Sequence, residues 1–322
     1  MKKLLIWTML CALLLTGCGQ TQEETAPEDD GKLKIVATIF PAYDFARAAA
    51  GELADVSLLL PPGAESHSYE PTPADILAVQ ECDLFVYLGG ESDAWVDNIV
   101  SGIDMKGETL RMVDCVELLE EMTVEGMELD AGHDHHDHEH ELGSVVDVDE
   151  HVWTSPENAA EITRAIGSKL MEMDPEHAAD YESSTESYAT QIDALDEEFE
   201  TFFDSLDDKT VVFGDRFPLR YFAEEYDLGY YAAFPGCSTQ TEPSAATIAF
   251  LTEKVKEEQI PAIFYIEFSN HLVADSIAEA TGTKTAMFHT CHNISPDDLA
   301  AGETYLSLMQ RNLETLKETL GN

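Results

Sequence analysis

Residues 174–208 read DPEHAADYESSTESYATQIDALDEEFETFFDSLDD, and this stretch decides the fold. Its apolar residues recur at steps of 7, 4, 3, 4, 3 and 4: Tyr181, Tyr188, Ile192, Leu195, Phe199, Phe202 and Leu206. Such spacing places them in one stripe along an amphipathic α-helix. A helix of about 30 residues spans about 45 Å, which is longer than most helices inside one domain. We therefore predict that a linking helix over 175–208 joins two lobes.

Short apolar runs alternate with helical patterns on both sides of this helix. The expected strands are 34–40, 56–60, 84–88 and 110–113 before it, and 211–213, 230–234, 263–266 and 285–288 after it. Strands that are apolar throughout are typical of parallel sheets covered on both faces by helices. The sequence therefore predicts two α/β lobes, 33–174 and 209–322, each with a mainly parallel sheet flanked by helices.

The first 18 residues, MKKLLIWTMLCALLLTGC, have the pattern of an export signal. Two lysines precede an apolar run from Leu4 to Leu15, which is too short for a comfortable membrane span. The end of the segment, Leu15-Thr16-Gly17-Cys18, resembles the bacterial lipobox, which implies removal of 1–17 and lipidation of Cys18. Residues 18–32 then form a polar tether. We expect an exported protein that is lipid-anchored to the outer face of the bacterial cell membrane.

The charge of the chain excludes some partners and favours others. There are 64 Asp and Glu against 17 Lys and Arg, a formal net charge of −47. Binding to nucleic acid requires clustered basic residues, so this class of partner is not expected. A large acidic surplus attracts cations. The chain is also 44% hydrophobic, enough to bury a core, so disorder throughout is not expected either.

A histidine-rich loop, residues 132–141, lies in the most acidic part of the chain. Residues 112–163 hold 16 carboxylates and neither Lys nor Arg. Imidazole and carboxylate together suit divalent metals such as zinc, but such a tract has no fixed geometry. We predict an auxiliary metal-binding loop formed by His133, His135, His136, His138 and His140.

Three other histidines follow expected strands or precede an expected helix. His67 follows the strand 56–60, His151 stands before the helix that starts near Pro156, and His289 follows the strand 285–288. In open α/β sheets, ligands bind at the carboxyl ends of the strands. These residues are the candidates for a rigid metal site.

Four cysteines remain in the exported chain once Cys11 and the lipidated Cys18 are set aside. Export allows disulfides, and we predict a bond between Cys237 and Cys291, which lie in loops of the C-terminal half. Free buried thiols are the alternative.

Two motifs carry a resemblance to a known family. The segment GAESHSYEPTPAD (63–75) resembles the first-ligand loop of the zinc/manganese ABC-transporter substrate-binding proteins, the TroA-like family. The segment DEHVWTSP (149–156) is similar to their second-ligand motif. The resemblance covers about residues 33–320. It implies a metal cleft between the lobes, with His67 and His151 as ligands, and a protein that captures a divalent metal outside the cell and delivers it to a membrane permease.

The sequence departs from the family pattern at both ligand positions of the second lobe. Gly214 stands where the third ligand is expected, and His289 stands where the family usually has Asp. The other donors of this lobe are Asp215, Glu267 and His292. We expect a site of His67, His151 and His289, completed by Glu267, Asp215 or water. Three imidazoles favour Zn²⁺, with Mn²⁺ as the alternative.

Other functions remain as alternatives to a zinc-binding transport protein. They are a manganese-specific member of the same family, a surface adhesin-type lipoprotein and a metallohydrolase. The run His133-Asp-His135-His-Asp137-His138 matches the metal motif of some hydrolases, but no strand precedes it to hold the ligands rigidly. We expect no enzyme activity.

Overall fold

The computed structural model describes residues 31–64, 69–90, 93–127, 148–236, 238 and 242–321. Residues 33–322 form one compact unit. The predicted export signal, most of the tether with Cys18, the histidine-rich loop, His67 and Cys237 lie outside the described residues. Among the helices of the described part, none has the length and apolar character that crossing a membrane requires.

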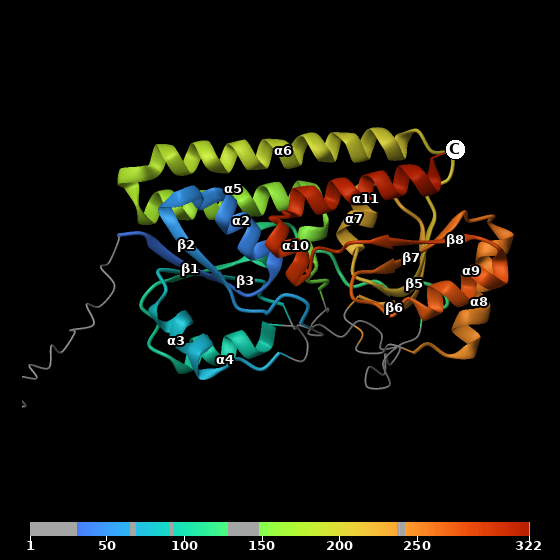
Figure 1. The fold of residues 1–322 in the computed structure, drawn as a ribbon, viewed down its shortest axis with the longest axis horizontal. Helices are drawn as coiled ribbons and strands as arrows, with labels where there is room; N and C mark the ends of the chain where they lie inside the picture. Colours follow the sequence, from blue (N-terminus) through green and yellow to red (C-terminus); the bar gives the residue numbers. More distant parts are fainter. Residues whose placement is uncertain are drawn as a thin grey trace, which may run out of the picture. The chain divides into compact units, whose positions relative to one another are not determined.

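Two four-stranded sheets form the framework of the unit, as predicted, and every strand pairing in them is parallel (Figure 1). The first sheet has the order β2-β1-β3-β4, with β1 Leu33–Ala37, β2 Ala54–Leu58, β3 Leu84–Tyr87 and β4 Glu108–Arg111. The second has the order β6-β5-β7-β8, with β5 Val211–Phe217, β6 Tyr230–Pro235, β7 Ala262–Ile266 and β8 Lys284–Phe288.

Helices flank both sheets and form a continuous layer along one side of the molecule (Figure 1). Those that follow the strands of the first sheet are α2 Phe40–Ala50, α3 Pro73–Glu81 and α4 Ala94–Gly102. Those that accompany the second are α7 Arg220–Glu225, α8 Ala245–Glu257, α9 Leu272–Thr281, α10 Pro296–Ala301 and α11 Tyr305–Leu320. Between the lobes in sequence come α5 Pro156–Met173 and α6 Ala178–Asp204.

The predicted linking helix is present as α6, preceded by a 3₁₀ turn over Pro175–His177. Its 27 residues correspond to about 40 Å. The predicted stripe is buried at Tyr181, Ile192, Leu195, Phe199 and Phe202, because this face packs on α5 and on both lobes. The helix ends at Asp204 rather than 208, so the last stripe residue lies beyond it.

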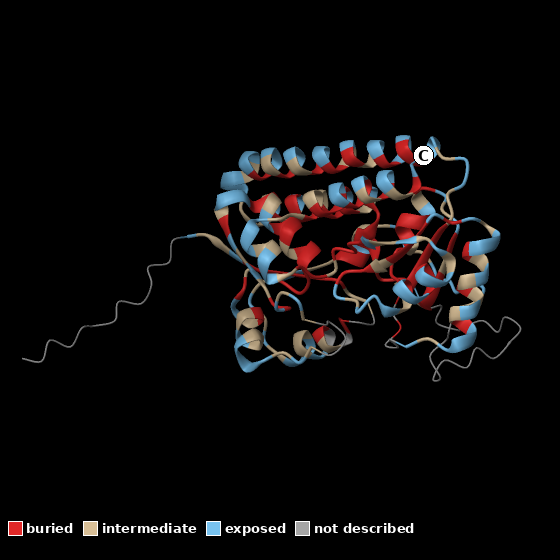
Figure 2. Cartoon of the chain, turned by 45° about the vertical axis from the view of Figure 1, so that its right-hand side comes forward, coloured by how far each residue is buried: buried red, intermediate tan, exposed pale blue. Residues whose placement is uncertain are grey.

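A second connection between the lobes was not predicted. The Tyr221 hydroxyl of α7 accepts a hydrogen bond from the backbone N of Leu119 at 3.1 Å, and Gly126 lies against the ring of Phe250 on α8. The chain that follows β4 therefore already contacts the second lobe before the linking helix begins. The lobes share one large hydrophobic cluster, and Figure 2 shows the buried residues concentrated between the helical layer and the sheets.

Strand β5 is longer than predicted and irregular. It extends to Phe217, and its register against β6 shifts between Phe213 and Arg216. Gly214 within it lies against α9, where a β-carbon would come within 2.7 Å of the backbone of Ala274. The irregularity sets how Asp215 and Arg216 reach the sheet edge, where the candidate site lies.

Candidate metal site

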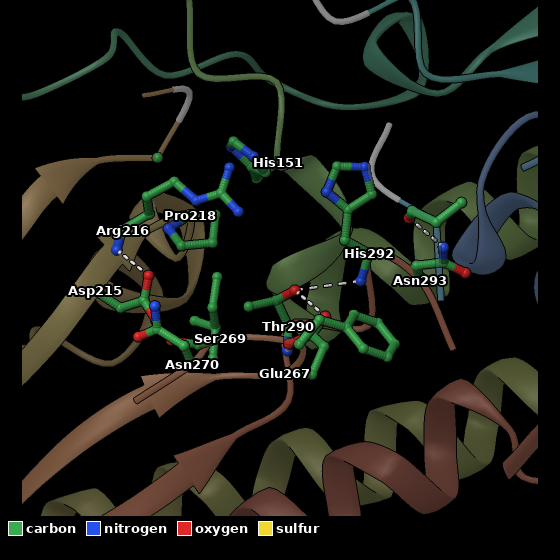
Figure 3. Close-up of a pocket in the computed structure, with 14 residues that line it drawn as sticks. His151, Asp215, Arg216, Pro218, Glu267, Ser269, Asn270, Thr290, His292 and Asn293 are labelled. Atoms are coloured by element: carbon green, nitrogen blue, oxygen red, sulfur yellow. Dashed lines mark hydrogen bonds between the residues drawn. The ribbon is translucent and has the colours of Figure 1, made fainter. Parts of the chain in front are cut away.

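A polar cavity of about 290 Å³ opens at the carboxyl ends of β5, β7 and β8 (Figure 3). The first lobe contributes Ala64 and His151 to its lining. The other lining residues are Asp215, Arg216, Pro218, Gly236, Ile266, Glu267, Phe268, Ser269, Asn270, Thr290, His292 and Asn293. The cavity lies where the parallel strands end, which is where open α/β sheets bind their ligands.

His151 is a buried imidazole with a fixed orientation. Its backbone N and its ring Nδ1 both lie within hydrogen-bond distance of Asp149 Oδ1, at 2.8 and 3.0 Å. A histidine that donates from Nδ1 to a carboxylate offers the lone pair of Nε2 to a metal. Burial acts to lower the pKa of His151, but the charges of Asp149 and Glu150 outweigh it and raise the pKa above its ordinary value.

Gly236 makes room for this ring. A β-carbon there would come within 3.1 Å of His151 Cε1 and 3.0 Å of the Cα atom of Pro218. The end of β6 therefore packs against His151, so backbone of the second lobe lies next to this histidine of the first lobe.

His292 faces His151 across the same cavity (Figure 3). The ring centroids of the two histidines are 6.1 Å apart, and both rings contact Trp153, at 5.4 and 5.2 Å. Two imidazoles on one tetrahedral zinc, with Zn–N bonds of about 2.0 Å, have ring centroids about 5 Å apart. The centroids of His151 and His292 are therefore about 1 Å further apart than in such a pair.

His289 does not line the cavity, although it follows β8 as predicted. Its ring Nδ1 accepts a hydrogen bond from the backbone N of Cys291 at 3.0 Å, and its backbone is held on both sides by Asn312. Cys291 has a φ of 61°, and this left-handed turn reverses the chain. The turn directs His289 into the protein interior and His292 toward the cavity. No pattern in the sequence predicts this turn.

The two candidate carboxylates of the second lobe differ in their hydrogen bonding. Glu267 accepts hydrogen bonds from the backbone N and the hydroxyl of Thr290, at 2.7 and 2.6 Å, so it holds the segment that carries His292. Asp215 uses Oδ1 to accept from the backbone N of Arg216 at 2.8 Å, whereas its Oδ2 is buried and has no hydrogen-bond partner among the described residues. A buried carboxylate oxygen without a donor is a natural cation ligand.

The described residues alone do not complete a metal site. Within the described ranges, no group of three or more His, Cys, Asp or Glu side chains is close enough to hold a metal ion. His67, the predicted first ligand, lies outside these ranges, and its near neighbour Ala64 lines the cavity. The assignment of His67 as a ligand stays a prediction, as does that of the auxiliary loop His133–His140.

Hydrogen bonds tie the segment around His292 to the first lobe. The Trp153 indole donates to the carbonyl of Thr290 at 2.9 Å, and the backbone N of Phe40 donates to the carbonyl of His292 at 3.4 Å. The side-chain amide of Asn293 donates to the carbonyls of Pro61 and Ala64, at 3.0 and 2.7 Å. A segment of the second lobe thus holds the start of the loop in which His67 stands.

The predicted disulfide between Cys237 and Cys291 is not formed in the structure. Cys291 is a free thiol, fully buried in the shared hydrophobic cluster, where its Sγ lies 3.8 Å from the carbonyl of His289. The reason is again the left-handed turn at Cys291, which places this side chain in the core. Cys82 and Cys115 are also free thiols.

Comparison with known proteins shows which family the chain belongs to. Residues 35–319 match the ZnuA family, described as zinc-uptake complex component A, periplasmic. The chain belongs to the ZnuA family. This ZnuA-family chain is 31% identical over 317 residues to the high-affinity zinc uptake system protein ZnuA of Bacillus subtilis, covering 96% of this chain and 95% of the relative.

A streptococcal relative is similar over a longer stretch. The zinc-binding lipoprotein AdcA of Streptococcus pneumoniae (strain TIGR4) is 33% identical over 323 residues, covering 99% of this chain but only 61% of AdcA. The ZnuA-family chain therefore spans about three fifths of the length of AdcA. The crystal structure of the Zn(II)-bound ZnuA-like domain of AdcA has a TM-score of 0.73 at 30% identity, covering 91% of this chain and all of that domain.

Proposed function

We propose that this protein is an extracytoplasmic zinc-binding lipoprotein that captures Zn²⁺ and delivers it to the permease of an ABC transporter. The observation that carries the proposal is the cavity in which the rings of His151 and His292 face each other and which Asp215 also lines. The names of its relatives, a zinc uptake protein and a zinc-binding lipoprotein, support the choice of metal. The cavity is a binding site in this proposal, and no reaction is assigned to it.

The proposed ligands are His67, His151, His292 and Asp215. His292 replaces His289 of the sequence prediction, because only His292 lines the cavity. Asp215 is preferred to Glu267, because Thr290 already occupies both oxygens of Glu267. Three imidazoles and one carboxylate suit Zn²⁺ better than Mn²⁺, which prefers oxygen ligands.

Anchoring and auxiliary binding complete the proposal. Cys18 carries the lipid that holds the protein at the outer face of the cell membrane, and the loop with His133–His140 binds further metal weakly. Deletion of residues 133–140 should leave the tight site intact and remove only the weaker binding, as measured by titration with zinc. Loss of the tight site would contradict this division of roles.

The central experiment is a zinc titration of the purified protein by calorimetry, in competition with a chelator. A tight zinc site in a folded chain represents roughly 10–16 kcal/mol for four ligands, so removal of one should weaken binding by about 100- to 1000-fold. We expect this loss for His151→Ala and His292→Ala. His289→Ala is the matched control, because it removes an imidazole three residues away that does not line the cavity.

The pH dependence supplies an independent check. Zinc binds neutral imidazole, so protons compete with the metal. Because the pKa of His151 is raised, this competition should begin at a higher pH than for an ordinary histidine. Equal losses of affinity in the His289 and His292 variants, or an unchanged affinity in His292→Ala, would refute the assigned ligand set.

A further inference from the structure

The hydroxyl of Tyr221 takes part in a backbone pairing of the first lobe. Glu120 and Val148 form an isolated antiparallel bridge, and beside it the backbone N of Asp149 donates to the carbonyl of Leu119 at 2.9 Å. In an antiparallel pair of this kind the two residues exchange both of their hydrogen bonds. Here the backbone N of Leu119 donates instead to the Tyr221 hydroxyl at 3.1 Å, and that hydroxyl donates to the carbonyl of Asp149 at 2.7 Å. We call these last two hydrogen bonds the hydroxyl bridge.

Asp149 is also the residue that orients the imidazole of His151. Its Oδ1 lies 2.8 Å from the backbone N and 3.0 Å from the ring Nδ1 of His151. All three side chains are buried, with Tyr221 3%, Asp149 2% and His151 1% exposed. A buried tyrosine hydroxyl that both donates and accepts is held in one orientation. The hydroxyl bridge therefore fixes the backbone of Asp149 and, through its carboxylate, the ring of His151.

The second lobe holds the segment around His151 on both sides. Tyr221 lies in α7, three residues after Pro218, which lines the cavity. Beyond His151, the Tyr305 hydroxyl of α11 donates to the carbonyl of Trp153 at 2.9 Å. The hydroxyl bridge is thus the support on the Asp149 side of the ring, and it comes from the same stretch of chain as one wall of the cavity.

Loss of the Tyr221 hydroxyl would leave two buried backbone groups without their shared partner. The backbone N–H of Leu119 and the carbonyl of Asp149 would then pay the cost of an unmade hydrogen bond. They can bond to each other only if Asp149 moves toward Leu119, and His151 then moves with it. A direct bond would restore the pairing, so the fold would keep most of its stability while the imidazole leaves its position.

We propose that Tyr221 is a positioning residue for metal binding, whose hydroxyl bridge holds Asp149 so that Nε2 of His151 faces the cavity. This inference rests on the proposed function, because it requires His151 to be a ligand. Tyr221 does not line the cavity, so it acts on the metal only through the ring that it positions.

The test compares Tyr221→Phe with Tyr226→Phe by zinc titration in competition with a chelator. Tyr226 is the matched control, because it is also 3% exposed and its hydroxyl donates to Asp196 Oδ1 on α6 at 2.7 Å, not to the segment around His151. We expect Tyr221→Phe to weaken zinc binding by about tenfold and Tyr226→Phe to leave it unchanged. In the His151→Ala background Tyr221→Phe should have no further effect on zinc affinity, because the ring through which it acts is absent.

Two further readouts separate positioning from a loss of stability. In protein saturated with Co²⁺, the visible bands that report ligand geometry should shift in Tyr221→Phe and stay in place in Tyr226→Phe. In the wild type, coupling is reciprocal, so zinc must stabilise the hydroxyl bridge. Hydrogen exchange at the backbone N of Leu119 should therefore slow on zinc binding more than at Leu306, whose backbone N donates to the Tyr188 hydroxyl at 3.3 Å outside the cavity lining.

The outcomes that overturn the proposal differ from those that overturn the proposed function. Unchanged zinc affinity and an unchanged Co²⁺ spectrum in a folded Tyr221→Phe refute the positioning role, as do losses that simply add to those of His151→Ala. If Tyr221→Phe does not fold, the exchange measurement decides, because equal slowing at Leu119 and Leu306 refutes the role as well. A wild type without tight zinc binding, or a His151→Ala variant that binds zinc as tightly as the wild type, refutes the proposed function itself.

Discussion

Asn293 offers a sharp test of how the fold organises the cavity. Its side chain is 3% exposed and makes three hydrogen bonds. Nδ2 donates to the carbonyls of Pro61 and Ala64 in the first lobe, and Oδ1 accepts from the backbone N of Ile294 at 2.7 Å. Asn293→Ala removes two of the hydrogen bonds that join the lobes and leaves the carbonyls of Pro61 and Ala64 to bond to water.

The size of the effect follows from these contacts. Each hydrogen bond contributes about 0.5–1.5 kcal/mol net, so the loss of two should weaken the attachment of residues 61–64 to the second lobe by about 1–3 kcal/mol. The loop that begins there holds His67, and zinc binding must then restore its position. We expect the zinc affinity of Asn293→Ala to fall by about 5- to 150-fold, since 1.4 kcal/mol corresponds to a factor of ten.

The assay is competition for zinc with a fluorescent chelator, with urea unfolding measured alongside. Ser184→Ala is the control, because it removes a hydrogen bond from α6 to the carbonyl of Ala49, at 2.6 Å, far from the cavity. It should lower the free energy of unfolding and leave zinc affinity unchanged. If both variants lose stability and neither loses zinc affinity, Asn293 does not position the loop and the reasoning fails.

Three further predictions concern packing, pH and thiols. In Gly167→Ala the new methyl group would lie 2.1 Å from Thr185 Oγ1, where α5 meets α6. The free energy of unfolding, measured with urea, should therefore fall by about 1–3 kcal/mol. A variant that is more stable than the wild type would show that the two helices can move apart without cost. Burial raises the pKa of Glu225 to about 9, so the folded chain keeps a proton that the unfolded chain loses above about pH 4.5, and stability should fall as the pH rises between these values. Glu225→Gln should therefore raise the melting temperature, with a gain that grows from pH 5 to pH 8; a gain independent of pH would contradict the burial of a protonated carboxyl. Alkylation of the denatured, unreduced protein should label Cys291, which the structure places in the core as a thiol, and a disulfide-linked Cys237–Cys291 peptide would instead restore the pairing predicted from the sequence.

Local patterns predicted the elements of this fold well. The stripe from Tyr181 to Phe202 is buried along α6 except at the half-buried Tyr188, and the apolar runs form two parallel four-stranded sheets. These features depend on side-chain periodicity within a single element, which is readable without knowing what the element packs against. The end of α6 and the irregular extension of β5 were not predicted, since packing against neighbours decides them.

The candidate site was predicted in part. His151 was found because it lies in a motif whose residues hold it locally, with Asp149 only two positions away. His292 was seen as a donor but placed behind His289, because position after a strand does not say which side chain points outward. The left-handed turn at Cys291 settles that question, and nothing in the sequence marks it.

By itself, then, the sequence determined the class of protein, the two lobes and the histidine motifs, because each rests on neighbours along the chain. Only the tertiary structure decided which donors meet. Asn293 contacts Pro61 across 232 positions, His292 faces His151, and Asp215 Oδ2 is buried without a partner in the described part of the chain. Such contacts join segments far apart in sequence, and their geometry depends on backbone turns and strand register that the whole fold imposes.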